Sequence, residues 1–267
     1  MISTMNKRLW VILVVLVVGT LGGLIWWRAS QNANTEYWKY LDYGKLVTAD
    51  SVVKARIKDA NERGNKDFKV SDDDKKAIIP DHYVGNKDAK VVVIEYEDFA
   101  CSHCAQMAST FDKIMQDYKD RVLFIYRNFN INFPNSTVTQ SAAEAAYLLG
   151  GEEAFWKMHG LLFQDDSIWT GEAIPMEKRK NLLGGFARDI GLDVNKFLNS
   201  ISSSAIRDNG ISDKIERDKK LGLAMAEADK VEKIGTPMWF VNNKEAKPSD
   251  ETIRKAIDEA LEKVNKN

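Results

Sequence analysis

Hydrophobic and polar positions divide this chain into three regions. Leu9–Trp27 is an uncharged apolar run of 19 residues. Residues 28–86 are polar and rich in charge. From residue 87 onward, short β-branched apolar runs alternate with segments in which apolar residues recur every three or four positions. These two patterns are typical of buried strands and amphipathic helices, so the third region predicts a globular α/β domain.

The first region predicts an uncleaved transmembrane helix at Leu9–Trp27, preceded by a short cytoplasmic tail, residues 1–8. At a rise of about 1.5 Å per residue, 19 residues approach the roughly 30 Å hydrocarbon core of a bilayer. Trp26 and Trp27 stand at one end, where interfacial aromatic residues belong. A cleaved signal peptide is the alternative, but it would have a shorter apolar core and small residues at its cleavage site.

The second region, residues 28–86, predicts a polar spacer that is partly helical. Asp50 is a candidate N-cap for a helix that ends near Arg63. Asn61–Asp74 is rich in Gly, Asp and Lys, and its composition indicates a linker. The favoured interpretation is a spacer that holds the following domain away from the membrane, with partner binding as the alternative.

The third region, residues 87–267, predicts strands that flank a long helical stretch. The strands are Val91–Tyr96, Val122–Tyr126 and Met238–Val241. Residues from about 138 to 230 show helical spacing without a convincing strand, which predicts a helical insertion. The predicted helices are Ala142–Leu149, Ala154–Phe163, Lys178–Ile190, Ile206–Ala228 and a last one that begins at Ser249 or Asp250 and ends near Val264. The pattern is that of an α/β fold with a helical insertion.

Charge excludes one class of partner. After residue 28 the chain carries 35 basic and 39 acidic residues, a net charge of −4, and it has no basic cluster. Nucleic-acid binding needs a positively charged surface, so no nucleic-acid partner is expected.

The candidate chemistry lies where the first strand of the domain meets its first helix. Cys101 and Cys104 are the chain's only cysteines, and they form a C-x-x-C motif. Cys101 falls near the helix N-terminus, where free N–H groups and the helix dipole favour a thiolate. We therefore expect an exposed, reactive Cys101, with Cys104 one turn inside the helix and able to close a disulfide. His103 can add a positive charge or a hydrogen bond to the thiolate.

Two other uses of the cysteines are less well supported. Zinc normally takes four ligands, and Cys101, Cys104 and His103 supply three at most. The other histidines, His82 and His159, lack ligand-like spacing to the pair. A structural disulfide more usually joins distant segments, because closing a longer loop constrains the unfolded chain more. No metal and no cofactor are expected beyond a redox-active disulfide.

The stretch VVVIEYEDFACSHC, residues 91–104, resembles the active site of DsbA-like thiol-disulfide oxidoreductases of the thioredoxin superfamily. Further similarity lies in Arg121–Phe129, Ala154–Phe163 and Ile234–Asn242, so the resemblance runs from about Gly85 to the C-terminus. It implies a thioredoxin-like fold interrupted by a helical subdomain. In the best-known members a proline occupies the position of Ser102.

The resemblance also assigns roles to individual residues. Thr236 and Pro237 match a motif whose proline is cis and lies beside the active-site sulfurs, so they become substrate-binding residues together with Ser102. Without the resemblance, a trans bond would be the expectation, since cis occurs in only about 5–6% of X–Pro bonds. Glu95 matches a partly buried acid beneath the disulfide that relays the proton of Cys104, although a solvated carboxylate is the alternative.

Three polar residues near the motif receive plainer interpretations. Glu97 and Asp98 are expected to be exposed acids in a turn. His159 is expected to be a core histidine rather than a catalytic one.

The expected protein is a membrane-tethered, extracytoplasmic thiol-disulfide oxidoreductase that introduces disulfides into exported proteins. Its partners would be unfolded or reduced exported proteins and, as the resemblance implies, a quinone-linked membrane reoxidase. One alternative is a tethered reductase or isomerase that uses Cys101 and Cys104 with electrons flowing the other way. The other is a non-enzymatic surface adaptor in which the disulfide is structural.

Overall fold

The computed structural model describes residues 36–164 and 168–266. The predicted anchor at Leu9–Trp27 and the tail before it lie outside these residues. Across the two described ranges no helix combines the length and the apolar character needed to cross a bilayer.

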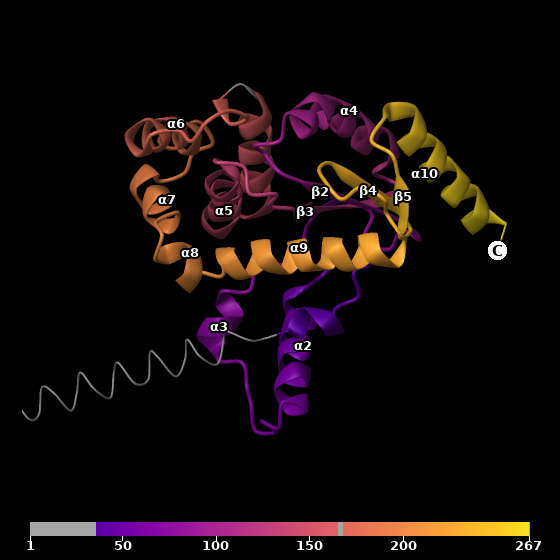
Figure 1. The fold of residues 1–267 in the computed structure, drawn as a ribbon, viewed down its shortest axis with the longest axis horizontal. Coiled ribbons are helices and arrows are strands. Elements are labelled where there is room, and N and C mark those ends of the chain that lie inside the picture. Colours follow the sequence, from indigo (N-terminus) through magenta and orange to yellow (C-terminus); the bar gives the residue numbers. More distant parts are fainter. Residues whose placement is uncertain (1–35, 165–167, 267) are drawn as a thin grey trace, which may run out of the picture.

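A five-stranded mixed sheet forms the centre of the molecule, in the order β1-β3-β2-β4-β5 (Figure 1). Only β2 and β3 run parallel, while the remaining neighbours are antiparallel. The strands are β1 (His82–Gly85), β2 (Val91–Glu97), β3 (Val122–Asn128), β4 (Met238–Val241) and β5 (Lys244–Ala246). All seven residues of β3 are buried, as predicted for an interior strand covered on both faces.

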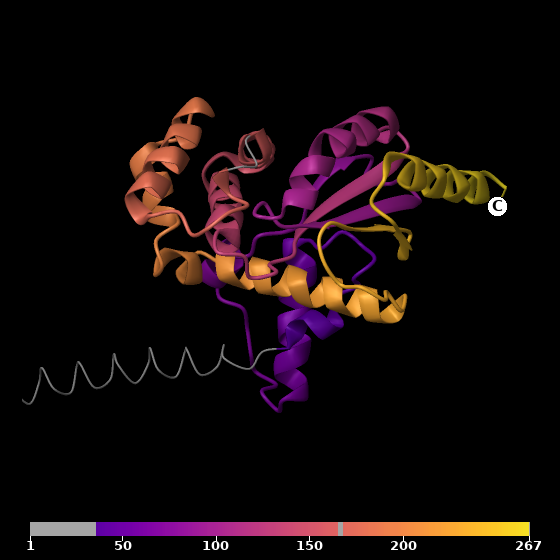
Figure 2. The same cartoon turned by 45° about the horizontal axis from the view of Figure 1, so that its top comes forward.

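Helices cover both faces of this sheet. Helices α4 (Ser102–Tyr118) and α10 (Asp250–Asn265) pack on one face, and α9 (Ile211–Ala228) lies across the other (Figures 1 and 2). Helix α10 begins at the predicted cap Ser249, whose hydroxyl accepts a hydrogen bond from the N–H of Thr252. Asn242 and Asn243 form the turn between β4 and β5, and both have positive φ.

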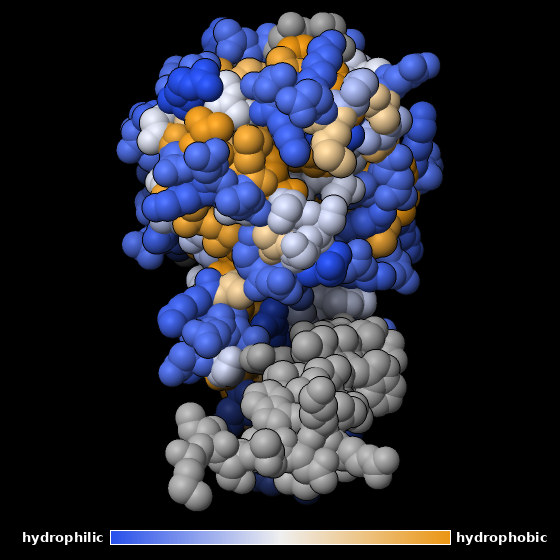
Figure 3. All heavy atoms as spheres, turned by 90° about the vertical axis from the view of Figure 1, so that its left-hand side faces the viewer, coloured by the Kyte–Doolittle hydropathy of each residue, from blue (hydrophilic) through white to orange (hydrophobic). Residues whose placement is uncertain are grey.

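The helical insertion separates β3 from β4, as the spacing of apolar residues predicts. It contains α5 (Ser136–Gln164), α6 (Met176–Asp189), α7 (Val194–Ser200) and α8 (Ala205–Asp208), followed by α9. The two helices predicted at 142–149 and 154–163 form one element, α5, with a kink at Gly151, whose φ is 70°. Leu149 and Met176 of the insertion are exposed apolar residues. Figure 3 shows apolar patches among hydrophilic residues on one face of the molecule.

The segment before the sheet is not the spacer that its polarity suggested. Helix α2 (Ala49–Glu62) and the short 3₁₀ helix η1 (Tyr37–Tyr40) share an apolar cluster with Leu221 of α9. Strand β1 belongs to the sheet, so the folded unit begins well before the predicted boundary at residue 87. The sequence hid this packing because the segment is polar overall, and its few apolar side chains come together in one cluster with Leu221 of α9 only in the folded chain.

Two local predictions in this segment are also wrong. The N-cap of α2 is Thr48 rather than Asp50. The Thr48 hydroxyl accepts a hydrogen bond from the N–H of Ser51, and the Ser51 hydroxyl accepts one from the N–H of Thr48. The stretch 61–74 predicted as a linker runs into α3 (Asp72–Lys76), a short helix capped by Ser71. It also buries Val70.

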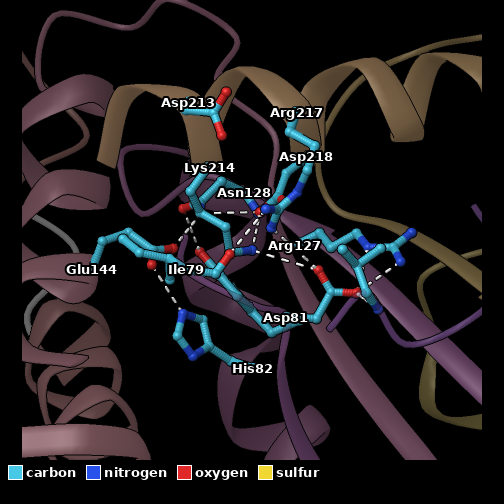
Figure 4. Close-up of polar contacts among 12 residues, drawn as sticks. Ile79, Asp81, His82, Arg127, Asn128, Glu144, Asp213, Lys214, Arg217 and Asp218 are labelled. Carbon is cyan, nitrogen blue, oxygen red and sulfur yellow. Dashed lines mark hydrogen bonds and ion pairs between the residues drawn. The ribbon is translucent and has the colours of Figure 1, made fainter. Parts of the chain in front are cut away.

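A buried polar network fastens the N-terminal segment to the sheet and to α9. Arg127 of β3 donates to Asp81 and to the backbone carbonyls of Tyr43 and Lys45, at 2.6–3.1 Å. On the far side of Asp81 lies a group of charged α9 residues, Lys214, Arg217 and Asp218. Figure 4 shows these side chains turned toward one another.

Three cations surround Asp81 in this network. Burial alone would raise the pKa of Asp81, but the charges of Arg127, Lys214 and Arg217 outweigh it and hold that pKa below its ordinary value. A second buried pair adjoins the network, in which His82 Nε2 lies 3.0 Å from Glu144 Oε2. The N-terminal segment is therefore joined to the domain by buried ion pairs around Asp81.

Candidate active site

The two cysteines lie where the sheet, α4 and the helical insertion meet. Strand β2 ends at Glu97, and Cys101 is the N-cap residue of α4, as predicted. Both cysteines belong to the apolar core that continues into the insertion, and both are free thiols. Cys101 is 3% exposed and Cys104 is fully buried, so the expectation of an exposed Cys101 is wrong. The residues that cover Cys101 come from distant parts of the chain.

One of these covering segments is the loop before β4. The Sγ of Cys101 donates a hydrogen bond to the backbone carbonyl of Thr236, at 3.3 Å. The Thr236–Pro237 peptide bond is cis, as the resemblance implies and unlike the expectation from base frequency. Ile234, two residues earlier, is 49% exposed beside this loop. The Thr236–Pro237 motif and the cysteines thus lie together, at the end of the sheet where β2 ends and β4 begins.

The site stabilises a thiolate on one cysteine only. The pKa of Cys101 falls to about 5, because the Cys104 thiol, the Thr236 side chain and the N–H groups of Cys104 and His103 stabilise its thiolate, against an opposing effect of burial. The pKa of Cys104 is raised well above its ordinary value, by burial first, then by its hydrogen bond to Cys101 and the charge of Glu97. At neutral pH the reduced pair therefore holds one negative charge, on Cys101.

His103 and Ser102 lie in the exposed first turn of α4. His103 acts on Cys101 through its backbone N–H. No hydrogen bond or ion pair connects its imidazole with another residue in the part of the chain that the structure describes. The N–H groups at the helix N-terminus contribute to stabilising the thiolate, as expected, and the role expected of the His103 side chain stays a prediction.

The acids around the motif are all buried. Val91 and Val93 of β2 face α4 and α10, whereas Ile94 faces α9. Side chains alternate along a strand, so Glu95 and Glu97 lie on the α4 face. Both are fully buried, and the prediction that Glu97 is exposed is wrong.

Asp98 is also fully buried, against prediction, because it ties the active-site loop to the start of α5. Its carboxylate accepts hydrogen bonds from the N–H of Ala100 at 3.0 Å, the N–H of Ile131 at 3.1 Å and the hydroxyl of Ser136 at 2.6 Å. Asp98 thus orients the loop that presents Cys101.

His159 of α5 lies within the same buried region. Its Nε2 atom is 3.3 Å from Oε2 of Glu97, and its ring packs edge-on against Phe99. The prediction of a core histidine is correct as to burial, since His159 is 4% exposed, but the partner is a carboxyl beside the cysteines. Sequence spacing gave no signal for this contact, because 62 residues separate Glu97 from His159.

In the described parts of the chain, no group of three or more His, Cys, Asp or Glu side chains could hold a metal ion. The arrangement supports thiol chemistry directly. It has a Cys101 thiol whose pKa is lowered to about 5, a buried partner thiol whose pKa is raised, and buried carboxyl groups nearby.

Comparison with known proteins agrees with this geometry. A family model described as Thioredoxin matches residues 77–259. The Probable disulfide bond formation protein D of Bacillus anthracis is 27% identical over 221 residues, which cover 82% of this chain and 92% of that protein. The Na(+)/H(+) antiporter NhaA 1 of Salinispora arenicola is 29% identical over 168 residues, 61% of this chain. This chain spans only 22% of the antiporter's length.

Solved structures show the same fold. BdbD from Bacillus subtilis, in its oxidised form, superposes with a TM-score of 0.56 at 23% identity, covering 68% of this chain and 93% of that chain. The thiol-disulfide exchange protein alpha-DsbA2 from Wolbachia pipientis superposes with a TM-score of 0.52 at 23% identity, covering 67% and 86%. The chain belongs to the thioredoxin family and is a thiol-disulfide oxidoreductase.

Proposed function

We propose that this protein is an extracytoplasmic, membrane-tethered oxidase that introduces disulfides into exported proteins through Cys101 and Cys104. The observation that carries the proposal is the opposite behaviour of the two thiols. The pKa of Cys101 is lowered to about 5, while that of Cys104 is raised. A stabilised Cys101 thiolate favours the reduced enzyme, and an enzyme whose reduced form is stabilised is a strong oxidant of other thiols.

In the oxidative direction, a substrate thiolate attacks Sγ of Cys101 and breaks its bond to Cys104. Cys104 leaves and takes up a proton, and the substrate is held in a mixed disulfide with Cys101. A second substrate thiolate then attacks the substrate sulfur of this bond, which forms the substrate disulfide and releases the Cys101 thiolate. Two electrons pass from the substrate dithiol to the enzyme.

Substrate binding is assigned to the loop of Thr236 and Pro237 and to Ser102 on the rim of the site. Thr236 already contacts Cys101 through its carbonyl, so a substrate backbone that pairs with this residue would bring its sulfur close to Sγ. The exposed Ile234 extends this surface and suits an unfolded chain that presents apolar side chains.

Location and partners are part of the same proposal. Leu9–Trp27 supports a single-pass anchor with a cytoplasmic N-terminus. Stable disulfides form outside the cytoplasm, which places the substrates among reduced exported proteins. An oxidase that turns over must pass its two electrons on, so we propose a quinone-linked membrane reoxidase as the second partner. The Bacillus anthracis relative carries the name of a disulfide bond formation protein, which fits this role.

The test is the equilibrium of the full chain with glutathione buffers, followed by alkylation of free thiols. A reduction potential well above the roughly −270 mV of thioredoxin, toward the roughly −120 mV of DsbA, is expected. A potential near that of thioredoxin would instead indicate a tethered reductase. If Cys101 and Cys104 formed no disulfide at all, the redox function would fail. Resistance to carbonate extraction and digestion by external protease in spheroplasts test the anchor and its orientation.

A further inference from the structure

Asp98 closes the turn that leads from β2 into α4. The N–H of Cys101 donates to the backbone carbonyl of Asp98 at 2.9 Å, and the N–H of Ala100 donates to Oδ1 of the Asp98 side chain at 3.0 Å. The carbonyl and the carboxylate of one residue thus hold the same four-residue turn, 98–101. Because Cys101 is both the last residue of this turn and the N-cap of α4, the position of Asp98 determines where the reactive sulfur lies.

The other carboxylate oxygen of Asp98 reaches the helical insertion. Oδ2 accepts a hydrogen bond from the Ser136 hydroxyl at 2.6 Å and one from the N–H of Ile131 at 3.1 Å. Ser136 is the first residue of α5, and both Asp98 and Ser136 are fully buried. A hydrogen bond to an ionised carboxylate is stronger than one between neutral groups, and the exclusion of water strengthens it further. The turn that carries Cys101 is therefore fixed to α5.

The start of α5 is held in place from its other side. The side-chain amide of Asn135, next to Ser136, donates to the backbone carbonyls of Trp169 and Glu172 at 2.9 and 3.0 Å. The side-chain oxygen of Asn135 accepts a hydrogen bond from the N–H of Ile174 at 3.1 Å. These bonds position Ser136 independently of the active-site turn, so the insertion is the support and the turn is the part that it supports.

The charge of Asp98 by itself works against the active site. All three hydrogen-bond partners of its side chain donate, two of them as backbone N–H groups, and three donors suit an ionised carboxylate. Burial raises the pKa of Asp98 against these bonds, and the charge of Cys101 raises it further, so carboxylate and thiolate repel each other. Any contribution of Asp98 to thiol exchange must therefore come from its hydrogen bonds rather than from its charge.

We propose that Asp98 and Ser136 are positioning residues that set the reduction potential of the Cys101–Cys104 pair, because their hydrogen bond fixes turn 98–101 against α5. With the turn fixed, Sγ of Cys101 lies at the N-terminus of α4, where N–H groups stabilise the thiolate of the reduced form. Without the bond the turn loses its support and the reduced form loses stability. This inference rests on the proposed function and names the contact through which the helical insertion tunes it.

The test is the equilibrium of the full chain with glutathione, in which two glutathione thiols reduce the Cys101–Cys104 disulfide and become one oxidised glutathione. The variants are Ser136→Ala, which removes one donor to Asp98, and Asp98→Asn, which removes the charge and nearly keeps the shape. The control is Ser141→Ala on the same helix. Its hydroxyl is also buried but has no hydrogen-bond partner among the described residues.

Both variants should make the enzyme a weaker oxidant. We expect Ser136→Ala and Asp98→Asn each to shift the equilibrium at least about tenfold toward the disulfide, a fall of roughly 30 mV in reduction potential. The titration of the Cys101 thiolate, followed by its absorbance, should move to higher pH in both. Ser141→Ala should stay within about twofold of the wild type, because it removes a buried hydroxyl from α5 without breaking a bond to the turn.

The sign of the Asp98→Asn effect separates positioning from electrostatics. Removing the negative charge alone would favour the Cys101 thiolate and make the enzyme a stronger oxidant. Asparagine instead places an amide nitrogen, which cannot accept, against at least one of the three donors, so the turn loses part of its support. An Asp98→Asn chain as oxidising as the wild type, or more so, would overturn the proposal.

The remaining outcomes are also decisive. Should Asp98→Asn not fold, as judged by circular dichroism, Ser136→Ala decides, and a wild-type equilibrium in that variant would reject the positioning role. A wild-type potential near that of thioredoxin would reject the proposed oxidase, yet a further fall in the two variants would still support the positioning role. A wild-type chain that forms no disulfide between Cys101 and Cys104 would reject both.

Discussion

The Sγ atom of Cys101 lies 3.3 Å from the carbonyl oxygen of Thr236, a residue 135 positions later in the chain. The helical insertion separates the two in sequence, and the sheet brings β2 and β4 side by side. The reactive sulfur is therefore held between a helix N-terminus and a loop from the far end of the domain. Both the charge of the sulfur and its access to substrate depend on this second segment.

The first prediction concerns the Thr236 hydroxyl. We expect Thr236→Val, which keeps the shape but loses the hydroxyl, to raise the pKa of Cys101 above about 5, because one of the polar groups that stabilise the thiolate is removed. The absorbance of the thiolate at 240 nm against pH measures this. The reduction potential should fall with it, since a less stable thiolate makes the disulfide a weaker oxidant. An unchanged titration would mean that Cys101 depends on the helix N-terminus alone.

The second prediction compares two replacements of Cys104. A hydrogen bond from Cys104 is the largest influence that lowers the pKa of Cys101. Cys104→Ala removes this donor, whereas Cys104→Ser keeps one, so Cys101 should titrate at a higher pH in the alanine variant than in the serine variant. Both variants should accumulate the mixed disulfide with a thiol peptide, because no second thiol resolves it. Equal titration curves for the two variants would contradict the assigned hydrogen bond.

Local sequence patterns were enough to predict the strands β2, β3 and β4, the capping position of Cys101 and the helical insertion. Each depends on the spacing of apolar residues or on a motif within a few positions. The sequence did not reveal the burial of Glu97 and Asp98, because their partners, His159 and Ser136, lie on α5 and approach them only in the folded chain.

The same physical reason explains the misjudged N-terminal segment. Strand β1 has four residues, too few for a clear alternation, and it is fixed by pairing with β3 about 40 positions later. In the sequence Asp81 is one more charge in a charged segment, and only the fold places Arg127 beside it. Charged residues that are buried in pairs cannot be told from solvated ones by composition.

The third prediction tests whether this network holds the N-terminal segment in place. Arg127→Met leaves Asp81 without its closest cation and releases the carbonyls of Tyr43 and Lys45. Breaking a buried ion pair typically costs about 3–5 kcal/mol, and we expect a loss of that size in the free energy of unfolding by urea. Hydrogen exchange should also rise at residues 43–47.

A matched surface variant controls this experiment. Lys54 and Asp50 form an exposed pair one turn apart on α2, with both side chains more than 70% exposed. Lys54→Met should change the free energy of unfolding by less than about 1 kcal/mol. If Arg127→Met were no more destabilising than this control, residues 36–81 would be a loosely attached segment after all.

The last prediction follows from the raised pKa of Glu95, which burial and the charge of Glu97 cause. In the unfolded chain this carboxyl titrates near pH 4.3, roughly the ordinary value for Glu. Between that pH and its higher folded pKa, the native state holds one more proton than the unfolded state, so the stability contributed by the protonated form is lost as the pH rises. Glu95→Gln stays neutral at every pH and should remove this loss. Its advantage in urea unfolding over the wild type should thus be larger at pH 8 than at pH 5.

Glu153→Gln, which alters an exposed partner of Lys157, should show no such trend. If Glu95→Gln followed the wild type at both pH values, Glu95 would ionise inside the protein without cost. If Glu95→Gln were more stable than the wild type but dithiothreitol reduced its Cys101–Cys104 disulfide more slowly, the chain would keep a destabilising acid for the proton relay to Cys104 that the resemblance implies.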